Sequence, residues 1–423
     1  MTNANLYALF QQRFPDDLTA PALVVPDGET ISYGNLNDMS ARIAGLLSSL
    51  GIGKGERVAV QVDKSPQAVA LYLACLRIGA VYLPLNTGYT PTEVEYFLGD
   101  AEPSLLVCRP QGEQALRKVI GDNPSLHVMT MDDDGKGTLI AQAQTAPPNT
   151  VVAQIEADDL AAILYTSGTT GRSKGAMLSH GNLASNALAL HQMWGWKEGD
   201  VLIHALPIFH VHGLFVAIHC ALLNGSKMWF LPKFDADQVL ELMPQSTVLM
   251  GVPTFYTRLV DHPGLTREAS ANMRLFVAGS APLLAETFSA FEDKTGQRIL
   301  ERYGMTETGM ITSNPLDGER LPATVGYPLP GVEVRVADED GKILDTEEIG
   351  VLEVKGANVF SGYWRMPEKT ASEFRDDGWF ITGDVAQMSE DGRVSIVGRA
   401  KDMIISGGYN VYPKEIESAI DEL

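Results

Sequence analysis

One ten-residue stretch concentrates groups that bind phosphate. Residues 165–174, YTSGTTGRSK, hold several hydroxyls, two glycines, Arg172 and Lys174, and no acid. Accessible backbone N–H groups, hydroxyls and a lysine can together cradle a phosphate anion. The whole chain has 53 acidic and 32 basic residues, a formal net charge of −21, so this acid-free loop favours a bound anion. An ordinary glycine-rich surface turn is the alternative interpretation.

The loop differs from the Walker A pattern, in which a glycine, a lysine and a hydroxyl residue follow one another. Here Gly171 is followed by Arg-Ser-Lys-Gly, and the next residues, GAMLS, favour a strand. A nucleoside triphosphatase of the P-loop type is therefore disfavoured, because its loop leads into a helix.

Composition excludes several classes of protein. A length of 423 residues predicts about two to four domains. The acid excess argues against nucleic-acid and anionic-membrane partners. The most apolar segment, 68–85, is interrupted by Arg77, Gly79 and Pro84 and is short for a membrane span, and the N-terminus lacks the apolar stretch of a signal peptide. Three scattered cysteines favour a reducing compartment, so we expect a cytoplasmic protein.

Helical and strand patterns alternate along most of the chain. Four short apolar runs, VLIHALP, KMWFLP, STVLMGVP and RLFVAGSA, are bounded by proline or glycine and are typical of buried parallel strands. From about residue 320 to 400 short strands and Asp-Gly turns predominate. The predicted fold is α/β: an α/β subdomain over 1–150, a second over 151–320, and a β-rich subdomain over 321–400. Residues 130–157 are interpreted as a linker.

Three further stretches match a known pattern in order and spacing. They are YGMTE at 303–307, GWFITGD at 378–384 and GRAKDMIISGGYNVYPKEIE at 398–417. With the 165–174 loop they resemble the adenylate-forming superfamily, which includes acyl-CoA synthetases and peptide-synthetase adenylation domains. The resemblance covers the chain from about residue 25 onward. Strings such as LMGVPTFYTRL and GYWRMPEKTASEFRDDG are most similar to bacterial malonyl-CoA synthetases.

The resemblance implies an ATP site and a role for each of its residues. Lys174 with 166–170 would hold the β- and γ-phosphates, Thr306 the α-phosphate and Glu307 a magnesium ion, while Asp384 would bind the ribose. Lys174, His210, Thr306 and Glu307 are the expected catalytic residues. The full set expected to contact ATP is Thr166, Ser167, Gly168, Thr169, Thr170, Gly171, Lys174, Gly279, Ser280, Ala281, Glu301, Arg302, Tyr303, Gly304, Met305, Thr306, Asp384 and Arg399. Without the motifs, Glu307 would be interpreted as a solvated charge and Tyr303 as a core aromatic; the resemblance has Tyr303 stack on adenine.

The resemblance also places the acyl pocket, in IFHVHGLF and GVPTFYTRLV. Arg258 in the second segment would hold the distal carboxylate of malonate, since a buried cation needs a partner. The alternative is that Arg258 points outward or pairs with a protein acid. The expected substrate contacts are His210, Arg258, Ser280 and Met305. Val211 replaces the threonine of similar proteins, which leaves malonate or methylmalonate open.

The expected activity is an ATP- and Mg²⁺-dependent acid–thiol ligase that joins malonate or a close dicarboxylate to CoA. Medium-chain or aryl acids are the alternative substrates, and a nucleotide- and carboxylate-binding module is a second alternative. The sequence does not indicate an oligomeric state. Lys401-Asp402 resembles the hinge to a small C-terminal α+β domain, of which 401–423 would be only the beginning. The adenylation lysine of the family would then lie beyond residue 423, and we expect a truncated, impaired enzyme.

Overall fold

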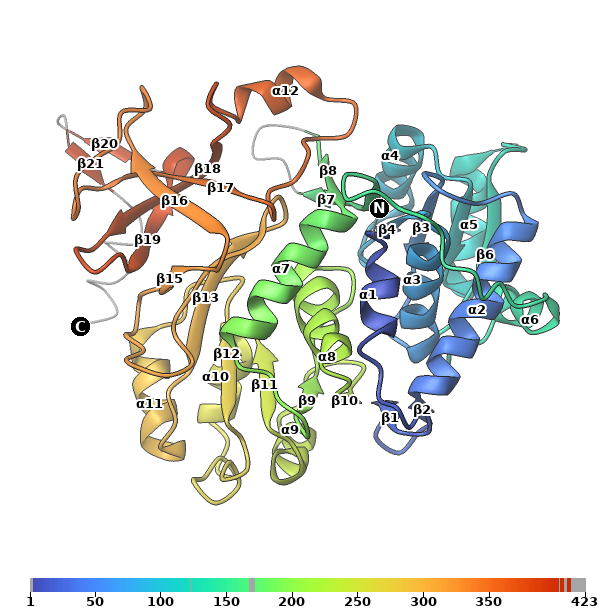
Figure 1. Cartoon of the computed structure of the whole chain (residues 1–423), viewed down its shortest axis with the longest axis horizontal. Coiled ribbons are helices and arrows are strands. Elements are labelled where there is room, and N and C mark those ends of the chain that lie inside the picture. The colour runs from blue at the N-terminus through green and yellow to red at the C-terminus, as the bar shows by residue number, and fades with distance from the viewer. Residues whose placement is uncertain (1–2, 122, 167–171, 403, 407–408, 412–423) are drawn as a thin grey trace.

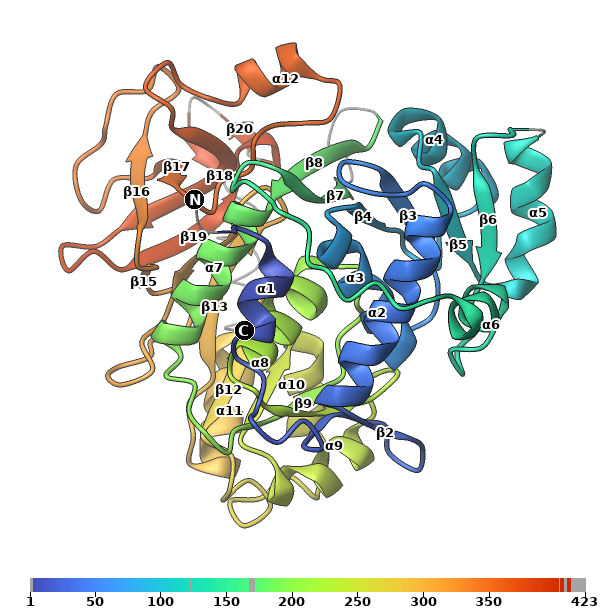
Figure 2. The same cartoon turned by 45° about the vertical axis from the view of Figure 1, so that its right-hand side comes forward.

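A computed structural model describes residues 3–121, 123–166, 172–402, 404–406 and 409–411 of the chain. Two large sheets covered by helices stand side by side, and a smaller antiparallel sheet lies above the second of them (Figures 1 and 2). This arrangement confirms the predicted α/β fold with a separate β-rich part.

The first large sheet has six strands in the order β6-β5-β3-β4-β7-β8, all parallel except the last pair. Its strands are β3 (Arg57–Gln61), β4 (Val81–Pro84), β5 (Leu105–Cys108), β6 (His127–Thr130), β7 (Leu160–Thr166) and β8 (Lys174–Ser179). Its helices are α2 (Tyr33–Ser49), α3 (Pro66–Ile78), α4 (Pro91–Ala101) and α5 (Pro110–Ile120). A capping box between Ser32 and Asn35 starts α2, and Gly51, at φ 79°, follows its end.

The second large sheet contains the four predicted apolar runs as parallel strands. Its order is β15-β14-β13-β12-β11-β9-β10-β1-β2. The strands are β9 (Val201–His204), β10 (Lys227–Phe230), β11 (Val248–Gly251), β12 (Leu275–Ala278), β13 (Leu300–Met305), β14 (Gly309–Ser313), β15 (Tyr327–Pro328), β1 (Pro21–Val24) and β2 (Thr30–Ser32). Its helical elements are α7 (His180–Met193), the π-helical turn η1 (His212–Ile218), α8 (His219–Leu223), α9 (Ala236–Leu242), the 3₁₀ turn η2 (Met243–Gln245), α10 (Pro253–Val260) and α11 (Ala285–Thr295).

Each large sheet includes a strand from the other side of residue 150, the predicted boundary between the two α/β subdomains. The N-terminal strand β1 pairs with β10 of the second sheet, while β7, after residue 150, pairs with β4 of the first. The N-terminal helix α1 (Leu6–Gln11) reinforces this exchange, because the backbone N–H of Leu6 donates to His180 Nδ1 at 3.1 Å. The sheets are therefore interlocked rather than joined by one linker.

The antiparallel sheet follows in sequence as β16 (Val332–Ala337), β17 (Gly350–Gly356), β18 (Phe380–Met388) and β19 (Val394–Arg399). The predicted turn at 391–392 joins β18 to β19, and Gly392 has φ 84°. Helix α12 (Pro367–Ser372) lies in the β17–β18 connection, at the top of Figure 1. The 3₁₀ turn η3 (Ala400–Asp402) leads to β20 (Ile404–Ser406) and β21 (Tyr409–Val411).

The linker predicted over 130–157 is wrong in part, because it contains helix α6 (Thr138–Thr145). Leu139 and Ala143 are buried and face α2. Two apolar positions in eight residues are too few for a periodic signal, so packing against α2 rather than local pattern forms this helix.

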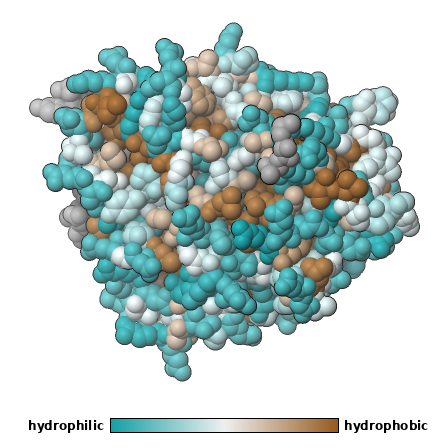
Figure 3. All heavy atoms as spheres, viewed as in Figure 1, coloured by the Kyte–Doolittle hydropathy of each residue, from teal (hydrophilic) through white to brown (hydrophobic). Residues whose placement is uncertain are grey.

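Apolar side chains gather in limited patches on a mostly hydrophilic face (Figure 3). Within the described residues, none of the helices combines the length and the apolar character that a membrane crossing requires.

Candidate active site

Lys174 is positioned by the hairpin of β7 and β8. Thr166 and Lys174 are opposite each other in the pairing of these strands, and Thr166 Oγ1 lies 3.5 Å from the carbonyl oxygen of Lys174. The predicted phosphate contacts Ser167, Gly168, Thr169, Thr170 and Gly171 lie outside the described residues.

Thr306 and Glu307 lie at the tip of the β13–β14 hairpin. A Cβ atom on Gly304 would lie 2.1 Å from the carbonyl oxygen of Gly309, so the close approach of these strands requires glycine there. Glu307 is only 5% exposed. Burial raises the pKa of its carboxyl group, against the opposing effect of a hydrogen bond from Tyr363.

Tyr363 and Glu373 connect Lys174 to Glu307, two of the predicted catalytic residues. The Tyr363 hydroxyl lies 2.9 Å from Glu307 Oε1 and 2.5 Å from Glu373 Oε2. Glu373 Oε1 in turn lies 3.1 Å from Lys174 Nζ, which also stands 4.1 Å above the centre of the Tyr363 ring. Lys174 and Glu307, 133 positions apart in the chain by the difference of their numbers, thus share one network.

Asp384 on β18 forms a second charged group together with Tyr303 and Arg399. Arg399 lies opposite Asp384 on β19, and its Nε is 2.7 Å from Asp384 Oδ1. The Tyr303 hydroxyl donates to the other carboxylate oxygen. Burial raises the pKa of Asp384, although the Tyr303 hydrogen bond and the Arg399 charge act in the opposite direction. Tyr303 on β13 is thus brought to Asp384 and Arg399 on the paired strands β18 and β19.

Ser280, Arg302 and His212 meet at the carboxyl ends of β12 and β13. Arg302 Nη2 donates to Ser280 Oγ at 3.2 Å, and His212 Nδ1 lies 3.4 Å from the same oxygen. Ser280 has φ 72°, a left-handed conformation that is strained for a residue with a side chain. A Cβ atom on Gly279 would lie 2.5 Å from Arg302 Cζ, so glycine leaves room for the guanidinium.

Arg302 is a buried cation with unused hydrogen-bonding capacity. It is 3% exposed, and its Nε has no hydrogen-bond partner among the residues that the structure describes. Burial lowers its pKa to about 9, so it stays charged at neutral pH. Within the described part of the chain, no carboxylate lies within ion-pair distance of it. A buried cation without an anion is unfavourable, and an anionic ligand would relieve this cost.

Arg258 and His210, two of the expected substrate contacts, are both exposed. Arg258 lies on α10 with its Cζ 4.9 Å above the ring of Phe234. The role of Arg258 at the distal carboxylate stays a prediction. The ring of His210 is tilted by 57° against that of Phe209, with the ring centres 4.5 Å apart, while His212 is buried and contacts Ser280. Met305 and Glu301 flank Arg302 on β13, Glu301 buried and Met305 half-buried, and Ala281 is exposed beside Ser280.

The four histidines between residues 204 and 219 lie in different settings. His204 contacts Lys64, His219 contacts the Tyr72 hydroxyl, His212 contacts Ser280, and His210 is exposed. Burial lowers the pKa of His204, His212 and His219, so these rings are neutral at pH 7.

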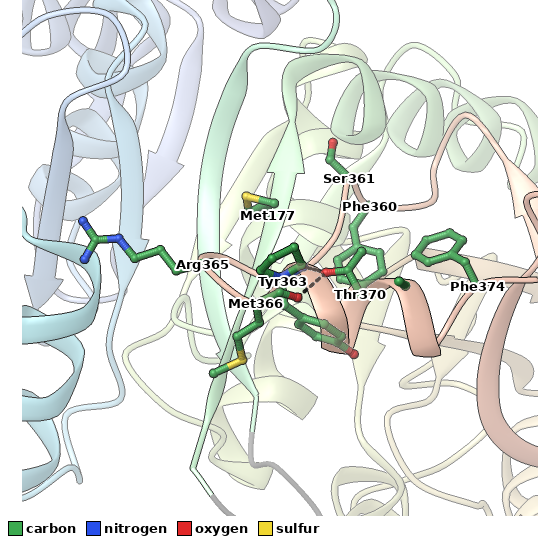
Figure 4. A pocket seen from close by; sticks show the side chains of 10 residues that line it. Met177, Phe360, Ser361, Tyr363, Arg365, Met366, Thr370 and Phe374 are labelled. Atoms are coloured by element: carbon green, nitrogen blue, oxygen red, sulfur yellow. Dashed lines mark hydrogen bonds between the residues drawn. The ribbon is translucent and has the colours of Figure 1, made fainter.

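A hollow of about 630 Å³ lies next to α12 and borders Tyr363, the residue that connects Lys174 to Glu307 through Glu373. Figure 4 shows Phe360 and Phe374 side by side on its wall, the backbone of Tyr363 bonded to Thr370, and Arg365 pointing away. The lining is mainly apolar and includes Met177 and Met366. It lies beside Tyr363 rather than at Ser280 and Arg302.

Sequence reasoning did not assign roles to Tyr363 and Glu373, and it named Arg302 only among the residues expected to contact ATP. A signal for Arg302 was present, because alternate residues of a strand face opposite sides. Arg302 must point away from Tyr303, toward Ser280. For Tyr363 and Glu373 no local pattern indicates which distant residues they contact.

Comparison with known proteins gives three informative similarities. The crystal structure of ATP-bound MatB from Rhodopseudomonas palustris is 55% identical, with a TM-score of 0.97 over 100% of this chain and 84% of that one. A malonyl-CoA ligase ternary product complex with methylmalonyl-CoA and AMP is 35% identical, with a TM-score of 0.81 over 99% and 86% of the two chains. Malonate–CoA ligase of Arabidopsis thaliana is 33% identical over 94% of this chain and 71% of its own length.

A family description, AMP-binding enzyme, matches residues 10–364. That range contains the β7–β8 hairpin, Arg302 and Glu307. Two of the four motifs, 165–174 and 303–307, also lie within the matched range. This chain belongs to the AMP-binding enzyme family.

Proposed function

We propose that the chain is an AMP-forming acid–CoA ligase that activates malonate or methylmalonate. The observation that supports it is Arg302, a buried guanidinium for which the described residues provide no carboxylate partner, placed with Ser280 and His212 and on the same β13–β14 hairpin as Glu307. A monocarboxylate has only the group that reacts, whereas a dicarboxylate has a second one for this cation. The named malonyl- and malonate–CoA ligases among its relatives support the same substrate class.

The distal carboxylate would accept hydrogen bonds from Arg302 and Ser280. Charge-assisted hydrogen bonds of this kind contribute about 1.5–3 kcal/mol each. We retain Arg258, an exposed cation on α10, as a second contact for the distal carboxylate, and His210 and Met305 as lining of the acyl site.

ATP would extend from Asp384 and Arg399 at the ribose to Lys174 at the phosphates. The residues fit a magnesium ion, because Glu307 offers a buried carboxylate next to the phosphate site and Mg²⁺ prefers such oxygen ligands. When bound, the ion would neutralise phosphate charge. Thr306 would contact the α-phosphate, and CoA would be the second substrate.

The chemistry requires positioning rather than a protein nucleophile. A carboxylate oxygen attacks the α-phosphorus of ATP, the bond from that phosphorus to pyrophosphate breaks, and acyl-AMP forms. The CoA sulfur then attacks the acyl carbon, the bond from that carbon to the AMP oxygen breaks, and the thiol proton is released. Cations held in fixed positions lower the barrier to the first step by stabilising the charge that develops on the phosphates.

A substrate panel tests the proposal. Pyrophosphate release and thioester formation should be highest with malonate or methylmalonate and low with hexanoate and benzoate, the runner-up substrates. Arg258→Ala should reduce only the dicarboxylate rates. A preference for hexanoate or benzoate would contradict the proposal, and ATP binding without any acyl-CoA formation would favour a binding module.

We also infer a reducing, cytoplasmic location. Its support is that Cys75, Cys108 and Cys220 are all buried free thiols. Fractionation of the native organism would test it.

A further inference from the structure

The residues that precede α12 form an additional edge beside β8, the strand that begins with Lys174. The backbone N–H of Met177 donates to the Gly362 carbonyl oxygen at 3.0 Å, and Trp364 N–H donates to Gly175 at 2.8 Å. Tyr363 bridges Ala176 in antiparallel fashion. This pairing fixes the position of Glu373, just beyond α12, relative to Lys174.

Glu373 contacts three side chains in the described part of the chain. Its Oε1 lies 3.1 Å from Lys174 Nζ and 2.6 Å from Lys369 Nζ, and its Oε2 lies 2.5 Å from the Tyr363 hydroxyl. The side chains of Lys174 and Glu373 are 18% and 19% exposed, whereas that of Lys369 is 43% exposed. The ion pair with Lys174 is therefore shielded from solvent, and Lys369 is the outer, solvated partner.

A carboxylate and a phosphate offer the same kind of acceptor oxygen to a lysine ammonium. ATP phosphates that reach Lys174 must compete with Glu373 for its ammonium group. A phosphate and the Glu373 carboxylate that contact the same ammonium group also repel each other. Glu373 does not need Lys174, because Lys369 one helical turn earlier already neutralises it. The geometry thus provides a way for Lys174 to change partner without leaving a carboxylate unpaired.

We propose that Glu373 is a positioning residue that holds Lys174 in the nucleotide-free enzyme, in place of the phosphate oxygens of ATP. It yields Lys174 to the triphosphate and remains paired with Lys369. This inference rests on the proposed ATP site at Lys174, and it adds that nucleotide affinity is lowered by a carboxylate built into the site.

The test is calorimetric titration of the full chain with ATP in EDTA, without magnesium. Glu373→Gln should tighten ATP binding by about three- to tenfold, because it removes a competing anion near the phosphates. Glu368→Gln is the matched control, since Glu368 is an exposed acid on the same helix, and should change the dissociation constant by less than about twofold. Adenosine, which has no phosphate, should bind both variants and the unaltered chain equally. A merely structural role of Glu373 would weaken ATP and adenosine together.

Lys369→Gln gives a second, opposite readout. It should weaken ATP binding, because Glu373 then depends on Lys174 alone. In the Glu373→Gln background the same change should have a smaller effect, as a double-mutant cycle measures. Unchanged or weaker ATP binding by Glu373→Gln, or equal effects of Lys369→Gln in both backgrounds, would overturn the inference.

Lys174→Ala separates this inference from the proposed function. If Lys174→Ala weakens ATP binding but Glu373→Gln does not tighten it, the inference fails and the ATP site stands. If Lys174→Ala leaves ATP binding unchanged, the proposed ATP site itself fails, and the inference fails with it.

Discussion

Arg302 and Ser280 meet across the ends of two neighbouring parallel strands, with Arg302 Nη2 3.2 Å from Ser280 Oγ. The guanidinium is buried and the serine is exposed. In the proposed function this pair offers a buried cation to the second carboxylate of a dicarboxylate, a group that a fatty acid lacks.

The strained conformation of Ser280 leads to the first prediction. Ser280→Gly and Ser280→Ala both remove the hydroxyl, so each should lower kcat/KM for malonate by about tenfold. Only glycine relieves the positive φ, so Ser280→Gly should be more stable than Ser280→Ala by about 1 kcal/mol. Urea unfolding and steady-state kinetics would measure both effects. Equal stability of the two variants would show that the left-handed backbone is not strained.

Glu307 should show opposite effects on stability and activity. Burial raises the pKa of its carboxyl group, which means that the charged form is disfavoured in the fold. Glu307→Gln should therefore leave the thermal midpoint unchanged or higher, while pyrophosphate release falls by about 100-fold or more. The control is Glu286→Gln, an exposed acid on α11. A large loss of stability with little loss of rate would assign Glu307 a structural role instead.

The contact between α1 and α7 predicts a pH dependence of stability. Burial lowers the pKa of His180 to about 4, below its ordinary value of 6.5. The unfolded chain therefore binds a proton at higher pH than the folded chain does, so the stabilisation is complete above 6.5 and is lost as pH falls toward 4. Between pH 7 and 5 this group should account for about 2 kcal/mol.

Urea unfolding of the unaltered chain and of His180→Asn at both pH values would measure that contribution. The asparagine variant should lose less stability on acidification, by the stated amount. The same loss in both proteins would mean that other groups, such as His204, His212 and His219, carry the whole effect.

The parallel strands of the second sheet could be predicted from the sequence. Runs such as 248–251 are apolar throughout, which is typical of a strand in a parallel sheet covered by helices on both faces. The membership of β1 in the second sheet could not be predicted, because strand pairing between residues 23 and 228 leaves no local pattern. The same holds for Glu373, whose contact with Lys174 depends on how the chain returns beside β8.

Arg258 and Arg302 illustrate the limit within the site. Sequence similarity directed attention to Arg258, but burial, which decides how much a cation needs an anion, is a property of the fold. Arg258 is exposed over Phe234, and Arg302 is enclosed. Because Arg302 is enclosed, we predict that it contributes more than Arg258 to binding the distal carboxylate.

The most direct test compares malonate with its monomethyl ester, which has the same carbon chain without the distal charge, in the unaltered chain and in Arg302→Met. Pyrophosphate release should give a kcat/KM for malonate about 100-fold or more above that for the ester in the unaltered chain. Arg302→Met should remove most of that difference while it keeps ATP binding. If the unaltered chain uses both acids equally, or if Arg302→Met binds ATP and still prefers malonate by the same factor, Arg302 does not recognise a second carboxylate.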